Sequence, residues 1–196
     1  MSQLLDNVVG ELSKLPGVGR RTALRLALHL LKQQKEDVSL LSGAIYDFRH
    51  KVKHCTRCNN ISDEGLCPIC SDARRDRQMV CIVEHVGDLL SIEMTGQYSG
   101  LYHVLGGVIS PLNGVAPSDL QLDLLESRIE QDQVREIILA LPTTIEGETT
   151  AYYLSKRLSK LGVEISAISR GIGFGDEIEY ADALTISHAL KNRKPL

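Results

Sequence analysis

Tryptophan is absent from this 196-residue sequence, and aromatic residues make up only 4% of it. Hydrophobic residues of all kinds still reach 43%, which is enough for the core of one ordinary domain with attachments, or of two modest domains. No run of about 18 apolar residues occurs, which argues against a membrane span. Residues 1–10 lack the basic region and the apolar run of a signal peptide. We therefore expect a cytoplasmic protein with no membrane partner.

Cysteine is scarce but concentrated. Four of the five cysteines form two Cys-x-x-Cys pairs separated by eight residues, Cys55 with Cys58 and Cys67 with Cys70. Such pairs can place four thiolates around one tetrahedral metal ion, and a closed four-sulfur site suits structural zinc. Two disulfides or a thiol redox pair are the alternatives, but clustered cysteines in a reducing compartment point to metal first. The pattern predicts one structural Zn²⁺ per chain.

Charge is segregated along the chain, although the net charge is only −3. Residues 12–35 contain six basic side chains and no acidic one: Lys14, Arg20, Arg21, Arg25, Lys32 and Lys35. Residues 84–148 contain only Arg128 and Arg135 against eleven Asp or Glu. A basic first part on an acidic body suggests a polyanionic partner at one end, although charge segregation can also be ordinary solvation.

A glycine-bounded turn interrupts two helical patterns near the start of the chain. Apolar residues at helical spacing occupy residues 4–12, then Pro16 and Gly17 end that helix, and a second apolar stripe runs from Ala23 to Leu31. Gly17 and Gly19 have no β-carbon, so a phosphate can approach the backbone and the free N–H groups of the second helix. Nearby arginines add charge contacts that cannot distinguish sequences. A helix-hairpin-helix that binds DNA is predicted; a plain helical hairpin is the alternative.

Strand and helix patterns alternate after the cysteines. We expect helices over about 38–52, 88–93, 120–131, 149–161 and 181–191, and strands over 79–83, 102–105, 136–141 and 163–168. Ser118 is expected to cap the helix from Leu120, and residues 142–148 to form a loop. The alternation predicts a parallel sheet covered on both faces, with Glu84 at the carboxyl end of its first strand. The glycine-rich segment 170–175 lacks the Gly-Lys-Ser/Thr of a P-loop, so we expect a flexible connection there.

The order of these parts resembles the bacterial RecR recombination mediator family over nearly the whole chain. The α/β part resembles a Toprim domain, in which carboxylates at the strand ends hold Mg²⁺ in the enzymatic members. Glu84 and the Glu146-Gly147-Glu148 segment match two of the three acidic elements of that site. Pro142 and Thr144, however, occupy the positions of the Asp-x-Asp element, which removes ligands that phosphoryl transfer would use. With no nucleophile elbow in the sequence either, no catalytic residue is predicted.

The resemblance implies four parts in a multi-part α/β chain. These are a helix-hairpin-helix DNA-binding region (1–53), a four-cysteine zinc finger (54–77), a Toprim domain with a doubly wound parallel sheet (78–172) and a C-terminal oligomerisation segment (173–196). Residues expected to face DNA are Gly17, Gly19, Arg20, Arg21 and Arg25. Glu84, Glu146 and Glu148 are expected to form an acidic surface for protein partners.

The implied function is that of a non-catalytic recombination mediator in DNA repair. Family members act with RecO and in many bacteria RecF, assemble as dimers or ring tetramers, and help to load recombinase onto single-stranded DNA. Two alternatives come from other classes of protein. One is a Mg²⁺-dependent Toprim nuclease or primase-like enzyme, against which Pro142 and Thr144 argue. The other is a zinc adaptor that never touches DNA.

Overall fold

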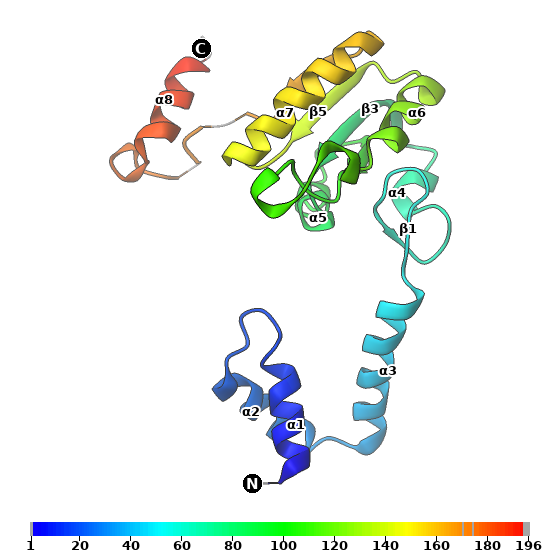
Figure 1. The fold of residues 1–196 in the computed structure, drawn as a ribbon, viewed down its shortest axis with the longest axis vertical. Helices are drawn as coiled ribbons and strands as arrows, with labels where there is room; N and C mark the ends of the chain where they lie inside the picture. Colours follow the sequence, from blue (N-terminus) through cyan, green and yellow to red (C-terminus); the bar gives the residue numbers. More distant parts are fainter. Residues whose placement is uncertain (1, 170, 174, 194–196) are drawn as a thin grey trace. The chain divides into compact units, whose positions relative to one another are not determined.

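The chain forms two compact units, divided between Val52 and Lys53 (Figure 1). The computed structural model describes residues 2–169, 171–173 and 175–193. Of the predicted glycine-rich connection, Arg170 and Phe174 therefore lie outside the described residues. Among the residues that are described, no helix is both long and apolar enough to cross a membrane.

The first unit is entirely helical. Helices α1 (Gln3–Leu12) and α2 (Arg20–Leu30) pack through a small core of Val9, Ala23 and Ala27. Helix α3 (Lys35–Lys51) begins three residues before the predicted start, because Glu36 and Asp37 suit the positive end of a helix. No residue of α3 is buried.

A parallel four-stranded sheet organises the second unit. Its strands are β3 (Asp76–Val83), β4 (Gly100–Val104), β5 (Glu136–Ala140) and β6 (Glu164–Ala167), in the order β4-β3-β5-β6. Each neighbouring pair of strands runs parallel. The predicted parallel sheet is thereby confirmed.

Both faces of this sheet are covered, so successive side chains of β3 pack into two different hydrophobic clusters, one on each face. Val80 and Ile82 of β3 pack on the side of α6 (Leu122–Asp132) and α7 (Ile145–Leu158). Cys81 and Val83 pack on the side of α5 (Val86–Glu93). Cys81 is thus a core residue, as its place in an apolar strand predicts. Helix α8 (Ala183–Lys191) follows the sheet and is capped by Asp182.

Two other predicted helix starts are also wrong. Ser118 lies inside a 3-10 turn (Pro117–Asp119), in which the Asp119 carboxylate accepts a hydrogen bond from Ala116 N, and α6 begins only at Leu122. Helix α7 begins at Ile145 rather than Thr149, because the Thr144 hydroxyl accepts a hydrogen bond from Gly147 N and caps it. Glu146 and Glu148 therefore belong to the first helical turn and not to a loop.

A cysteine-rich module precedes the sheet. It consists of an antiparallel pair, β1 (Lys53–His54) and β2 (Ile61–Ser62), followed by the single turn of α4 (Pro68–Ser71). The module is hydrogen-bonded to the sheet, since Val104 N of β4 donates to Cys58 O at 2.9 Å. The module therefore covers the outer edge of β4.

Candidate zinc centre and nucleic-acid interface

The four paired cysteines converge on one point. Their sulfur atoms all lie within 4.8 Å of one another, and all four side chains are buried. Cys58 Sγ and Cys67 Sγ are 3.6 Å apart. A tetrahedral ion with Zn–S bonds of about 2.3 Å separates its ligand sulfurs by about 3.8 Å, whereas a disulfide needs about 2.05 Å. The spacing fits a metal site and not a pair of disulfides.

Local backbone geometry explains how the second pair is held. Cys67 is the N-cap of α4, Pro68 is the first helical residue, and Cys70 N donates to Cys67 Sγ at 3.5 Å. Proline suits this position because its missing N–H has no partner to lose there. This turn directs both thiols of the pair toward the same point.

The thiols share their protons unequally. Hydrogen bonds with Cys67 and Cys70, together with burial, raise the pKa of the Cys58 thiol, while hydrogen bonds from Cys58 and Cys70 lower the pKa of Cys67. Four anionic thiolates packed this closely need a cation, and Zn²⁺ bound to four sulfurs supplies it. The cysteines would hold zinc as a closed structural centre with no position for substrate.

The turn between α1 and α2 has the backbone features expected for a phosphate site. Gly17 has φ +76°, a left-handed conformation that favours glycine, and Gly19 is the N-cap of α2. Gly19 offers no side chain to the first N–H groups of α2. Arg20 and Arg21 occupy the first turn, which contains no acidic residue. Cations at this positive end of a helix are unfavourable unless an anion approaches.

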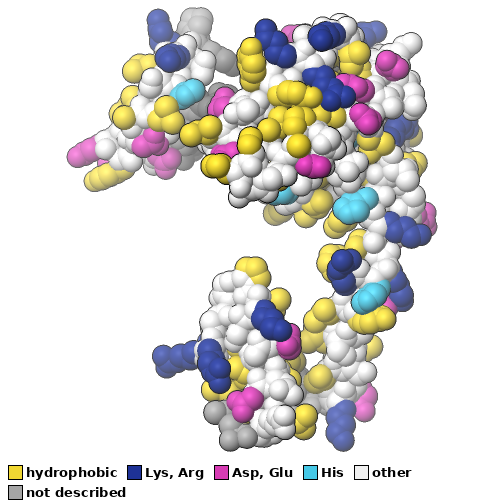
Figure 2. Space-filling view, in the orientation of Figure 1, with side chains coloured by type: hydrophobic (Ala, Val, Ile, Leu, Met, Phe, Trp, Pro, Cys, Tyr) yellow, Lys and Arg dark blue, Asp and Glu magenta, His cyan; other side chains and the backbone are white. Residues whose placement is uncertain are grey.

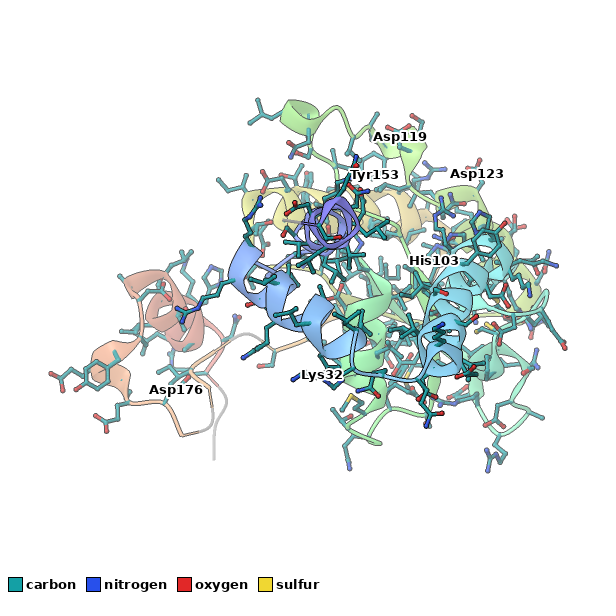
Figure 3. All side chains as sticks on the ribbon, turned by 90° about the horizontal axis from the view of Figure 1, so that it is seen from below. Lys32, His103, Asp119, Asp123, Tyr153 and Asp176 are labelled. Atoms are coloured by element: carbon teal, nitrogen blue, oxygen red, sulfur yellow. The ribbon has the colours of Figure 1, made fainter. Side chains whose placement is uncertain are left out.

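Basic side chains continue along α2 beyond the turn. A shallow groove of about 470 Å³ is lined by Arg21, Leu24, Arg25, Leu28, His29 and Lys32. Figure 2 shows dark-blue Lys and Arg side chains projecting from this unit, and Lys32 lies just past the end of α2 (Figure 3). His29 and Lys32 are not among the residues predicted to face DNA. Their helical spacing indicates them, since His29 is four residues after Arg25 and Lys32 is three residues after His29.

The acidic residues predicted to face partners gather at one end of the sheet. Glu84 follows β3, and Glu146 and Glu148 lie in the first turn of α7, just beyond the adjacent strand β5. Glu84 Oε1 lies 3.2 Å from His85 Nε2. Within the described part of the chain, the four cysteines alone form a group of three or more potential metal ligands. The structure therefore brings these carboxylates to a common edge without assembling them as a ligand set.

Family models match nearly the whole chain in four consecutive pieces. They are described as RecR helix-hairpin-helix (residues 5–48), RecR four-cysteine zinc finger domain (52–72), Toprim domain (78–169) and RecR C-terminal (171–194). A protein named recombination protein RecR from Porphyromonas gingivalis is 51% identical over 192 residues, covering 98% of this chain and 93% of the relative. The chain belongs to the RecR family. A relative of the same name from Bacteroides fragilis is 50% identical, covering 98% of this chain and 94% of its own length.

Membership of the RecR family tests the predictions for the cysteine module and for the α/β part. The four-cysteine module is a zinc finger, which confirms the predicted structural zinc and excludes the disulfide and redox interpretations. The predicted Toprim domain is confirmed as well. Relatives named recombination proteins place this chain in recombination and repair.

Proposed function

We propose that this RecR-family chain is a non-catalytic mediator that binds DNA through its first unit and RecO-type, and where present RecF-type, partners through the acidic edge of its Toprim domain. In this role it helps to load recombinase onto single-stranded DNA. The proposal includes a cytoplasmic location, a homo-oligomeric assembly and the four-part division at residues 53, 77 and 172.

The exposed basic row on α2 is the observation that carries the DNA-binding part. Arg20, Arg21 and Arg25 are all exposed beside the Gly17–Gly19 turn. Guanidinium groups and free backbone N–H groups bind phosphate oxygens, which are the same in every DNA sequence. We therefore propose sequence-independent contact with the DNA backbone.

The partner-binding part is supported by the arrangement of Glu84, Glu146 and Glu148. Glu84 Oε1 lies 3.2 Å from His85 Nε2, and the Thr144 hydroxyl caps α7, so both groups already have contacts within this edge. These contacts support a surface role in preference to phosphoryl transfer. An acidic rim of this kind suits a basic surface on another protein. Binding of a RecO-type partner should weaken when Glu146 and Glu148 are changed to Gln.

Salt-dependent DNA binding tests the DNA-binding proposal. Changing Arg21 and Arg25 together to Ala should weaken binding to all sequences alike and lower the slope of log K against log salt by about 1.8, since each phosphate contact contributes about 0.9. Fluorescence anisotropy over a range of salt concentrations measures both quantities. Arg135→Ala, which removes an exposed arginine of the other unit, is the matched control. An unchanged slope would contradict the assigned contacts, and no DNA binding by wild type at low salt would favour the adaptor alternative.

Incubation with DNA and Mg²⁺ or Mn²⁺ tests the non-catalytic part. We expect neither cleavage nor extension of a strand. Activity that disappears in Glu84→Ala would establish the enzymatic alternative.

A further inference from the structure

Arg128 is a buried cation with an incomplete set of hydrogen bonds. It lies in α6 and is 2% exposed. Its Nη1 donates to Tyr102 O at 2.6 Å, and its Nε lies 3.4 Å from Asp132 Oδ2. Its Nη2 is buried and has no hydrogen-bond partner among the residues that the structure describes. A buried guanidinium left partly unsatisfied is costly unless a further negative charge lies nearby.

The cysteine module lies next to this guanidinium on the same strand. Tyr102 and Val104 are two residues apart on β4, so their outward backbone groups are about 7 Å apart. Arg128 binds Tyr102 O, while Val104 N donates to Cys58 O at 2.9 Å and Val104 O accepts from Asn59 Nδ2 at 2.9 Å. The guanidinium and the backbone of the first cysteine pair thus occupy consecutive positions along one edge.

A second link joins the module to the same helix. Arg57, which lies between Cys55 and Cys58, forms an ion pair with Asp132, the same carboxylate that Arg128 contacts. Asp132 is therefore shared by two arginines. The three side chains together carry a net charge of +1.

The zinc centre carries the opposite charge. One Zn²⁺ and four thiolates sum to −2, and the four sulfurs are buried, so water does not neutralise this charge. Arg57 and Arg128 are the cations that the contacts described above bring to this module.

We propose that Arg128 is the counter-charge of the zinc–tetrathiolate centre, and that its bond to Tyr102 O makes zinc occupancy a condition for the order of β4 and α6. Arg128 is a positioning residue in this role and not a metal ligand. With zinc bound, the −2 centre neutralises the excess positive charge of the arginines. Without zinc, that charge remains buried without the −2 centre to balance it, and both α6 and the edge of β4 are destabilised.

Zinc affinity is the first test. Competition with a chelator should show about 10–100-fold weaker zinc binding by Arg128→Met, the range typical of lost outer-shell partners of a metal site. Arg128→Lys keeps the charge and should retain most of the affinity. Arg135→Met, which removes an exposed arginine of the same unit, should bind zinc as wild type does. Wild-type affinity in a folded Arg128→Met would overturn the proposal.

Cobalt substitution separates the charge from a purely structural role. Removing a nearby cation raises the energy of the thiolate electrons, so the sulfur-to-cobalt charge-transfer band of Co²⁺-loaded Arg128→Met should move to longer wavelength. Arg128→Lys should restore the wild-type position. An unshifted band in Arg128→Met would show that the guanidinium does not act on the metal centre.

Hydrogen exchange on wild type tests the coupling even if the Met variant does not fold. Removing zinc with a chelator should speed exchange of the Val104 amide and of the amides of residues 128–132 in α6. The Ile165 amide in β6, at the opposite edge of the sheet, should change least. Faster exchange confined to the cysteine module, with α6 unchanged, would overturn the coupling.

Discussion

Gly147 shows why a glycine lies between the two glutamates of the Toprim segment. A β-carbon built at this position would overlap with the backbone carbonyl of Pro142. Glycine therefore lets the first turn of α7 pack directly on the backbone of Pro142, in the segment that follows β5. Gly147 N also donates to Thr144 Oγ1. The constraint comes from packing and not from metal binding.

Gly147→Ala should destabilise the fold by about 1–3 kcal/mol, because a backbone atom must move to make room. Urea unfolding monitored by circular dichroism measures the change. The control is Gly87→Ala in the first turn of α5, where an added β-carbon meets nothing within 4 Å. That variant should be neutral or slightly stabilising, since alanine is the better helix former. Equal effects of the two substitutions would contradict the packing explanation.

His103 gives the fold a specific sensitivity to acid. It lies in β4 (Figure 3) and is fully buried, with Nε2 2.8 Å from Gln121 O and Nδ1 without a hydrogen-bond partner among the described residues. Burial lowers its pKa from 6.5 to about 4, with a further contribution from the charge of Arg128. The native state therefore favours neutral imidazole, and protonation favours the unfolded chain.

Stability should consequently be complete above pH 6.5 and fall as the pH is lowered toward 4, by on the order of 3 kcal/mol in total. Between about pH 7 and pH 5, wild type should lose about 2 kcal/mol more than His103→Gln, which can still donate to Gln121 O but cannot gain a charge. Unfolding free energies from urea titrations at the two pH values measure the difference. Thiol protonation affects both proteins equally, so parallel pH dependence would disprove the role of His103.

At the scale of elements, periodic patterns predicted the helices and strands but not how some of them begin. The start of α7 was missed because Pro142, two threonines and Gly147 resemble a loop. The Thr144 cap and the close approach of Gly147 to Pro142 make it helical instead. Ser118 was a reasonable N-cap by residue type, but Pro117 and the Asp119 hydrogen bond favour a separate 3-10 turn. Such competition is decided by tertiary geometry.

For the zinc centre, the sequence predicts the ligands but not the contacts that surround them. Two Cys-x-x-Cys pairs identified the ligands, because tetrahedral coordination fixes their spacing. Nothing in that spacing indicates that Cys58 O and the Asn59 side chain cover the edge of β4, or that Arg57 and Arg128 share Asp132. The contacts that residues 57–59 make with Val104 and Asp132 link positions 45 to 75 residues apart in the chain. They depend on the assembled sheet.

On the scale of the whole molecule, two helices leave apolar surface uncovered. Helix α3 exposes Ile45 (63%) and Phe48 (62%), and α8 exposes Leu184 (66%) and Leu190 (61%). Exposed apolar side chains repeated along a helix favour association with another surface. They suit the homo-oligomer proposed above, in which the first unit and the C-terminal segment each contact another copy of the chain.

A closed ring of four chains related by two-fold axes needs two different interfaces, whereas a dimer needs one. Changing Ile45 and Phe48 together to Glu should remove the interface at α3, and changing Leu184 and Leu190 together to Glu should remove the one at α8. Sedimentation equilibrium measures the mass. If wild type is a tetramer, each pair of substitutions should leave dimers held by the other interface, and all four together should leave monomers. Leu112→Glu, at a position 96% exposed in the 3-10 turn Pro111–Asn113, controls for added charge and should keep the wild-type mass. A tetramer that survives both pairs would show that the uncovered faces of α3 and α8 serve partners other than this chain.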